Sequence, residues 1–375
     1  MVYLDYSATT PVNKSVIDTY SKVCTDYIGN PNSLHKLGCS AKNLIDASVK
    51  QIASILGVLP EEVIFTSGAS EANNLAIKGI CSKYKNRGRH IITTRLEHSS
   101  VSQAISYLEE NGFSVDYVNL LDDGTVDLED LDNKIRDDTI LISIVAVNSE
   151  IGIIQPLDKI SKIIRKYPKV YFHSDVTQAI GKLKIDFSCL DLATFSAQKF
   201  FGMKGVGCLI KRKKIIIDPL IHGGKSTTIF RSGTPATPLI VSLAKALRLC
   251  YEDFDIKYNK VRELHDYLID NLKKFDIYIN SGDNCVPHII NISFKNIKSE
   301  VMLHALEEDD IYVSTQTACS SGGYSLALLA VFSDKDRASN SLRISLSYLT
   351  TKEELDEFLK SFTNKFNRLS SLIKN

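Results

Sequence analysis

Short runs rich in β-branched residues alternate with helical segments over residues 63–173, and this alternation limits the fold more than any other feature of the chain. The expected strands are Val63–Phe65, His90–Thr93, Ser114–Asn119, Ile140–Val147 and Val170–His173. The expected helices between them are Ala72–Lys83, Val101–Asn111, Asp127–Asn133 and Leu157–Lys166. Strands separated by helices are joined by crossover connections, which favour a largely parallel sheet with helices on both faces.

One lysine lies between two strands that are expected to be buried. The run Asp191–Ser196 leads to Lys199, and a glycine-rich return then leads to the strand Val206–Ile210. A lysine in that position loses water, which favours the neutral amine that forms imines with aldehydes. The same stretch also fits a surface lysine in a hairpin turn, so other residues must decide between the two interpretations.

The composition is that of a soluble globular protein. The chain has 375 residues and a net charge of +1, which gives no reason to expect nucleic acid or an anionic membrane as a partner. The amino terminus does not resemble a signal peptide, and no apolar run is long enough to cross a bilayer. The eight cysteines form no C-x-x-C pair, so we expect free thiols, no resident metal and a cytoplasmic location.

The pattern of elements changes near residue 255. The remaining expected elements are the helical stretches 239–251 and 257–275, the strands His288–Phe294, Ile311–Ser314 and Leu342–Leu346, and the helices Ser299–Glu308 and Lys352–Phe366. We therefore expect a large domain at residues 15–255 and a smaller α+β domain at residues 256–375. Residues 1–14 are expected to pack with the smaller domain.

Polar residues follow several of the expected strands, at the edge where parallel sheets bind ligands. The turn Thr66–Glu71 joins a strand to a helix, and its free amides and the Ser70 hydroxyl suit a phosphate, although most turns of this kind only cap a helix. His98 and Asp175 also follow strands. A carboxylate in the position of Asp175 needs a cationic partner, which is either a protonated pyridine nitrogen or a structural ion pair.

Two residues of the expected smaller domain also suggest chemistry. Arg343 lies inside a strand of apolar neighbours and must find an anion, for which a substrate carboxylate would serve. Cys319 lies in a loop of small residues just beyond a strand, which is the setting of an accessible thiol and not of a core cysteine.

Taken in order, these motifs resemble those of the cysteine desulfurases, pyridoxal phosphate enzymes of the class V aminotransferase family. The motifs are Tyr3–Pro11, Gly29–Pro31, Phe65–Glu71, Glu97–His98, Asp175–Gln178, Ser196–Lys199, Arg231–Thr234 and Thr317–Ser320. The resemblance implies an α/β fold of pyridoxal phosphate transferase fold type I, with a mainly parallel seven-stranded sheet, a smaller α+β C-terminal domain and a homodimer. The loop at Ala318–Ser321 looks like the long-cysteine-loop branch, which feeds iron–sulfur cluster assembly or tRNA thiolation through a sulfur-acceptor protein.

The resemblance implies roles for the residues around the cofactor. Lys199 binds the cofactor aldehyde and moves protons, Asp175 pairs with the pyridine nitrogen, and His98 stacks on the ring and shuttles a proton. Gln178 and Ser149 lie near the phenolic oxygen. The residues implied to hold the phosphate are Ala69, Ser70, Ser196, Gln198 and, from a second subunit, Thr234.

The resemblance also implies how L-cysteine is used. Asn30 and Arg343 hold the substrate carboxylate. The Cys319 thiolate attacks the substrate sulfur and leaves a persulfide on the enzyme together with L-alanine. Cys319 could also ligate a cluster transiently.

Two positions depart from the family. Gln198 stands where the family usually has histidine, and its amide can donate to a phosphate but carries no charge. Ser149 aligns with an asparagine, so the tuning of the cofactor could differ, or a water could fill the gap. Asn148 is not a simple substitute, because adjacent residues of a strand face opposite ways.

Other functions are compatible with parts of the sequence. A selenocysteine lyase or a class V aminotransferase would use the same cofactor, and a scaffold could keep the fold without catalysis. Cys319 argues against transamination, which needs no loop thiol. A non-catalytic relative would be free to lose Lys199, Asp175 and Arg343, so their presence argues for an enzyme. The sequence names neither the sulfur acceptor nor the preference for sulfur over selenium.

Overall fold

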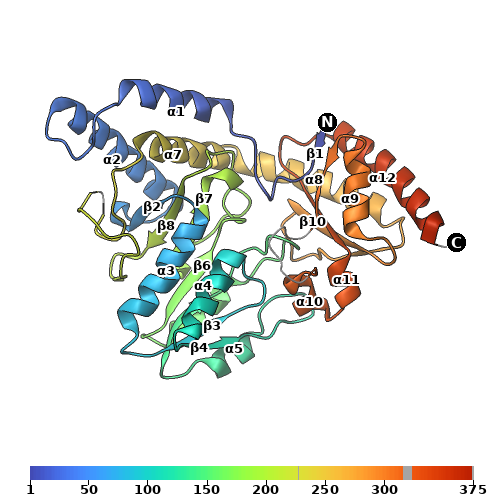
Figure 1. The fold of residues 1–375 in the computed structure, drawn as a ribbon, viewed down its shortest axis with the longest axis horizontal. Helices are drawn as coiled ribbons and strands as arrows, with labels where there is room; N and C mark the ends of the chain where they lie inside the picture. The colour runs from blue at the N-terminus through green and yellow to red at the C-terminus, as the bar shows by residue number, and fades with distance from the viewer. Residues whose placement is uncertain (227, 316–322, 374–375) are drawn as a thin grey trace.

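The computed structural model contains a large α/β region and a smaller α+β region side by side (Figure 1). It describes residues 1–226, 228–315 and 323–373. The two regions have separate sheets, each has its own main hydrophobic core, and a smaller cluster of buried residues from both regions joins them. The helix α8 (Phe254–Leu272) begins beside the expected boundary near residue 255 and packs in the smaller region.

The large region is built on a seven-stranded sheet in the order β2-β8-β7-β6-β5-β3-β4. Its strands are β2 (Val63–Thr66), β3 (His90–Thr93), β4 (Ser114–Tyr117), β5 (Thr139–Ser143), β6 (Tyr171–Asp175), β7 (Leu192–Ser196) and β8 (Gly207–Lys211). β8 runs antiparallel to β2 and β7, and the other neighbouring strands pair in parallel. The predicted mainly parallel, seven-stranded sheet is confirmed.

Helices cover both faces of this sheet (Figure 1). They are α1 (Lys14–Asp26), α2 (Lys36–Leu56), α3 (Ala69–Tyr84), α4 (Ser99–Glu110), α5 (Leu128–Lys134), α6 (Leu157–Ile164) and α7 (Thr237–Tyr251). Consecutive strand residues face opposite layers, so that Ile91 packs with α3 and α4 while Ile92 packs with α2, α5, α6 and α7. This double burial explains why the strands read as unbroken apolar runs.

The smaller region contains a four-stranded antiparallel sheet in the order β12-β13-β10-β9. Its strands are β9 (Ile277–Ile279), β10 (Ile289–Phe294), β12 (Ser314–Thr315) and β13 (Ser341–Ser345). Its remaining helices are α9 (Ser299–Glu307), α10 (Leu326–Phe332), α11 (Lys335–Ser339) and α12 (Lys352–Ile373). The predicted combination of a large α/β part and a smaller α+β part is confirmed.

Residues 1–13, which we call the N-terminal segment, link the two regions. The strand β1 (Val2–Tyr3) pairs in parallel with β11 (Ile311–Tyr312), and Leu4 is buried in the smaller core. Further along, the backbone N–H of Thr10 donates to the carbonyl oxygen of Gln198 at 3.0 Å in the large region. The segment therefore crosses the carboxyl edge of the large sheet.

Within the described residues, none of the helices combines the length and apolar character needed to span a membrane.

Candidate active site

β7 carries Lys199 to the carboxyl edge of the large sheet. The strand ends at Ser196, and a single 3₁₀ turn at Ala197–Lys199 follows. The chain then reverses through Gly202, where an added Cβ would lie 2.8 Å from the carbonyl oxygen of Ala197. Only glycine fits that approach, so the tight return after the lysine follows directly from the sequence.

The amine of Lys199 is held by the N-terminal segment. Nζ donates to the carbonyl oxygen of Ser7 at 2.7 Å and to that of Ala8 at 2.6 Å. Both acceptors are backbone atoms, so they hold the amine without adding a formal negative charge.

The surroundings of Lys199 favour its neutral form. Burial lowers the pKa of Lys199 to about 8, and the positive charge of Arg343 acts in the same direction. The carboxylates of Asp5 and Asp175 oppose this shift. An amine with this pKa is neutral in an appreciable fraction of molecules at neutral pH, which an imine-forming lysine requires.

Asp175 lies at the end of β6 and is only 4% exposed. Its Oδ1 accepts from the backbone N–H of Thr177 at 2.9 Å, and its Oδ2 accepts from Nδ2 of Asn73 at 2.8 Å. The two donors fix the plane of the carboxylate. A buried carboxylate oriented in this way is suited to pair with a protonated ring nitrogen.

His98 is the N-cap residue of α4. Its Nδ1 accepts from the backbone N–H of Ser100 at 3.2 Å and lies 2.9 Å from the Ser100 hydroxyl. Partial removal from water lowers the pKa of His98, Lys199 acts in the same direction, and Asp175 opposes both. His98 therefore interacts electrostatically with Lys199 and Asp175, the two groups predicted to share its site.

Glu97 fixes the loop that carries His98. Its Oε1 accepts from the Thr94 hydroxyl at 2.9 Å and from the backbone N–H of Val145 at 2.8 Å. Burial raises the pKa of Glu97 to about 8. The carboxyl group thus ties the loop after β3 to the chain that leaves β5.

The predicted phosphate turn precedes α3. Gly68 is the N-cap residue and supplies no side-chain cap, so the first amides of the helix, at Ala69 and Ser70, are available to a ligand. Ser196 lies opposite, because a Cβ built on Gly68 would be 3.8 Å from its Oγ. Gln198 is in the adjacent turn after β7.

An ion pair braces this turn from behind. Glu71 accepts from the backbone N–H of Ser67 at 2.7 Å, and Nε of Arg231 pairs with the same carboxylate at 2.9 Å. Thr234 follows Arg231 by three residues and is exposed in the single chain.

Gln178 is held on both sides of its amide. Nε2 donates to the carbonyl oxygen of Ser7 at 3.0 Å, and Oε1 accepts from Nζ of Lys182 at 2.5 Å. Burial lowers the pKa of Lys182 to about 7. The amide group of Gln178 is therefore turned toward the segment that also holds Lys199.

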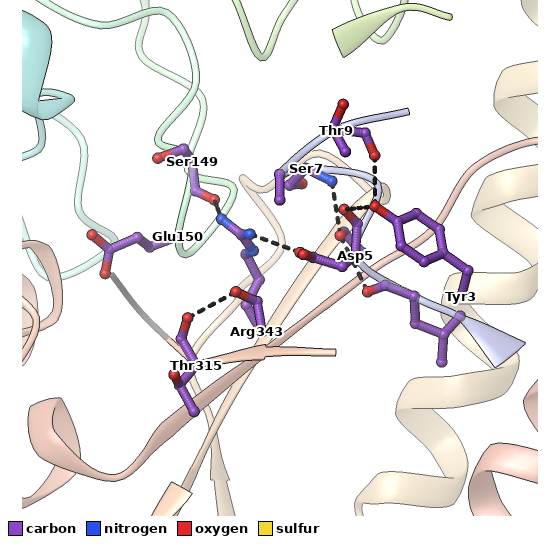
Figure 2. Close-up of polar contacts among 12 residues, drawn as sticks. Tyr3, Asp5, Ser7, Thr9, Ser149, Glu150, Thr315 and Arg343 are labelled. Carbon is purple, nitrogen blue, oxygen red and sulfur yellow. Dashed lines mark hydrogen bonds and ion pairs between the residues drawn. The ribbon is translucent and has the colours of Figure 1, made fainter. Parts of the chain in front are cut away.

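Arg343 projects from β13 toward the N-terminal segment (Figure 2). Its Nη1 donates to the carbonyl oxygen of Ser149 at 2.9 Å, and its Nη2 pairs with Oδ1 of Asp5 at 2.9 Å. Its buried Nε has no hydrogen-bond partner among the described residues. The guanidinium is thus held in one orientation and keeps a donor for a substrate carboxylate.

The chain around Ser149 departs from the prediction. The strand expected at Ile140–Val147 ends at Ser143, and a turn follows Asn148. Asn148 caps this turn: its Oδ1 accepts from the backbone N–H groups of Glu150 at 3.0 Å and Ile151 at 2.8 Å. The strand-based reason for excluding Asn148 was therefore wrong. Asn148 cannot replace the family's asparagine because its amide is already used.

Asn30 does not meet Arg343 within one chain. It lies in the loop between α1 and α2, at the end of the large region away from the smaller one (Figure 1), and its Oδ1 accepts from the backbone N–H of Asn32 at 2.9 Å. Nδ2 of Asn32 donates to the Ser226 hydroxyl at 3.0 Å, which places this loop beside the one that leads to Thr234.

Cys319 lies outside the described residues. The last described residue before it, Thr315, ends β12, and the preceding Ser314 pairs with Arg343 in the neighbouring strand. The chain therefore enters the predicted cysteine loop beside the arginine (Figure 2).

Sequence reasoning did not identify Asn73, Lys182 and Asp5 as parts of the site. Lys182 had a signal, because it follows Gln178 by four residues in a run that is otherwise mainly apolar. Asn73 sits in a helix and Asp5 in a motif near the terminus, and neither pattern says which partner the side chain meets.

These groups fit pyridoxal phosphate. An amine of lowered pKa, an oriented carboxylate and the uncapped start of α3 surround one edge of the sheet. They are suited to an aldehyde, a ring nitrogen and a phosphate in that order.

Comparisons with known proteins agree with this geometry. The aminotransferase class-V family model matches residues 2–358. The cysteine desulfurase IscS of Dictyoglomus turgidum is 38% identical over 378 residues, which cover 99% of this chain and 96% of that protein. The solved structure of a NifS-like protein has a TM-score of 0.93 and 35% identity, covering 98% of this chain and all of that one (100%). A structure of SspA in complex with cysteine has a TM-score of 0.83 and 32% identity, covering 94% of this chain and 100% of that one.

Proposed function

The chain belongs to the aminotransferase class-V family and is a pyridoxal phosphate-dependent cysteine desulfurase, and from this premise we propose how its own residues perform the reaction. L-cysteine is the substrate and L-alanine the carbon product, with the sulfur transferred to Cys319. The observation that carries this proposal is the arrangement of Lys199 and Arg343, which the same N-terminal segment holds through Ser7, Ala8 and Asp5.

The aldehyde, the ring nitrogen and the phosphate of the cofactor each have a suitable group in this chain. Lys199 would hold the cofactor aldehyde, Asp175 would pair with the ring nitrogen, and the start of α3 with Ser196 and Gln198 would hold the phosphate. When bound there, pyridoxal phosphate supplies an electron sink that weakens the bonds at Cα and Cβ of the substrate.

Arg343 orients the substrate by its carboxylate. The contact that Nη1 makes with Ser149 and the ion pair with Asp5 hold the guanidinium plane, so the substrate meets a donor that is already in place. Lys199 and His98 then move protons at the substrate Cα. Burial lowers the pKa of Lys199 to about 8, which brings this amine close to neutral pH, as a proton carrier needs.

Sulfur transfer takes place at the Cys319 thiolate. The thiolate attacks the substrate sulfur, a bond forms between the two sulfur atoms, and the Cβ–S bond breaks with its electron pair remaining on carbon. The carbon skeleton takes up a proton and leaves as L-alanine, while Cys319 keeps the sulfur as a persulfide. A sulfur-acceptor protein of iron–sulfur cluster assembly or tRNA thiolation then removes it.

We also propose that the protein is a homodimer in the cytoplasm. Two neighbouring segments expose apolar side chains: the loop between α1 and α2 with the first turn of α2, and the loop that contains Ser226. The contact between Asn32 and Ser226 joins them. These side chains are Ile28, Leu34, Leu37, Ile221 and Ile229. A second copy seated there would place Thr234 and Asn30 at its partner's site, and the free thiols among the described cysteines suit a reducing compartment.

The test is a Cys319→Ala variant of the full-length holoenzyme. It should keep the yellow colour of the bound cofactor but release no sulfide from L-cysteine, since no thiol accepts the sulfur. Cys24→Ala, which removes a thiol that is exposed in the structure, is the matched control and should retain turnover. Unchanged turnover of Cys319→Ala in the presence of reductant would rule out the persulfide route.

A further inference from the structure

Asn73 lies on α3 behind the candidate site, and its side chain is fully buried (0% exposed). Its Nδ2 donates to Oδ2 of Asp175 at 2.8 Å and to the Ser100 hydroxyl at 2.9 Å. Its Oδ1 accepts from the Thr194 hydroxyl on β7. One amide thus joins β6, β7 and α4.

The carboxylate of Asp175 decides how this amide is turned. An ionised carboxylate only accepts hydrogen bonds, so the NH₂ group of Asn73 must face Asp175. The carbonyl oxygen of Asn73 must then face Thr194, whose hydroxyl has to donate to it. The opposite rotamer of the amide would place two acceptors against each other.

The same logic continues to His173. Its Nε2 lies 3.2 Å from the Thr194 hydroxyl, which has already used its only proton on Asn73, so Nε2 must carry a proton and donate. Its Nδ1, 2.8 Å from the Ser143 hydroxyl, therefore accepts. Burial lowers the pKa of His173 to about 4, which keeps the ring neutral at neutral pH and makes its tautomer well defined.

On the other side, the chain of bonds reaches His98. Ser100 accepts from Asn73, so its own proton is free for Nδ1 of His98, which also accepts from the backbone N–H of Ser100. With Nδ1 accepting twice, the proton of the neutral His98 ring lies on Nε2. In this tautomer Nε2 can donate a hydrogen bond to a bound substrate but cannot accept one.

We propose that Asn73 is a positioning residue of this enzyme: it holds the Asp175 carboxylate toward the cofactor and transmits its ionised state to the tautomers of His173 and His98. The proposal rests on the proposed roles of Asp175 and His98. The chain of bonds itself is a property of the protein without cofactor, so it can be tested separately.

The first measurement is ¹⁵N NMR of histidine-labelled, cofactor-free protein, with His173 assigned by a His173→Gln variant. The parent should show His173 protonated on Nε2 only. In Asp175→Asn the new amide can donate to Asn73, which lets the Asn73 amide turn over. The Thr194 hydroxyl then accepts from Asn73 and donates to Nε2 of His173. The proton of the His173 ring should therefore move to Nδ1. When Asp175→Asn is added to an Asn73→Leu variant, the tautomer of His173 should stay as it is in Asn73→Leu alone, because the amide that connects the two residues is gone.

The second measurement is cofactor binding by absorbance. Asn73→Leu should weaken pyridoxal phosphate binding by about 10-fold and shift the pH profile of turnover, as loss of an orienting partner does at other sites. Asn271→Leu, which changes another helical asparagine whose Nδ2 bonds to a backbone carbonyl, is the control and should match the parent.

The outcomes separate the two proposals. A parental His173 tautomer in Asp175→Asn would overturn the role of Asn73, whatever the enzyme catalyses. A shifted tautomer in a protein without desulfurase activity would support the coupling and would count against the proposed function alone. If Asn73→Leu does not fold, the nearly isosteric Asp175→Asn and a Thr194→Val variant, which removes the hydroxyl that links Asn73 to His173, still decide the matter.

Discussion

The two sides of the candidate site are held in different ways. On the large sheet, Asp175 is fixed by buried, matched donors and acceptors that come from neighbouring strands and helices. On the small sheet, Arg343 is fixed by a carbonyl and by Asp5, a carboxylate 338 residues away in sequence whose side chain is 21% exposed. One side is a hydrogen-bond network and the other depends on a partly solvated ion pair.

This difference has a physical consequence. Removing one member of a buried hydrogen-bond network lowers the free energy of unfolding strongly, because the partners of that member stay buried and unpaired. A partly exposed ion pair loses less stability, since water replaces the missing partner. Variants on the large-sheet side should therefore affect cofactor binding and folding. Variants on the small-sheet side should affect the affinity for the substrate and the pKa of Lys199.

Removing the lysine should have the largest effect. Lys199→Ala should give a colourless protein whose alanine formation falls by roughly 10³-fold or more, because the group that holds the cofactor is lost. Absorbance spectra and an alanine assay measure both effects. Lys204→Ala, an exposed lysine in the same return, should behave like the parent, and a yellow, active Lys199→Ala would break the assignment.

Removing Arg343 should weaken substrate binding without affecting cofactor binding. Arg343→Gln should raise KM for L-cysteine by about 100-fold while the protein stays yellow, since the proposed contact with the substrate carboxylate is lost and the groups proposed to hold the cofactor remain. Steady-state kinetics beside the spectrum provide the measurement, and Arg95→Gln at an exposed site is the control. A parental KM would mean that the carboxylate binds elsewhere.

A substitution at Asn148, which caps a turn, should affect folding stability. Asn148→Ala leaves two backbone N–H groups without their acceptor and should lower the free energy of unfolding by about 1–3 kcal/mol. Urea denaturation followed by circular dichroism measures this change. If the unfolding midpoint does not change, the two hydrogen bonds that this side chain accepts contribute little.

The smallest effects should appear in pH dependence. Capture of pyridoxal phosphate by cofactor-free protein needs the neutral amine of Lys199, so its rate should rise with pH and level off above a midpoint of about 8. Arg343→Gln removes a charge that lowers this pKa and should move the midpoint upward. Asp5→Asn removes a charge that raises it and should move the midpoint downward. Stopped-flow absorbance measures the rate, and shifts in the same direction would contradict the electrostatic reasoning.

The sequence by itself determined the layered architecture and most of one side of the site. Apolar runs between helices required a parallel sheet, and the residues that follow each strand, such as His98 and Asp175, had to meet at its carboxyl edge. The glycine-rich return after Lys199 could also be predicted, but the close approach to Ala197 that requires glycine at position 202 is known only from the structure.

Only the tertiary structure decided which groups share hydrogen bonds and charge. The Asp5–Arg343 pair joins two ends of the chain, and Asn73 meets Asp175 across 102 positions, distances over which local patterns carry no information. The pKa of Lys199 likewise depends on burial and on the sum of charges that folding brings around one amine.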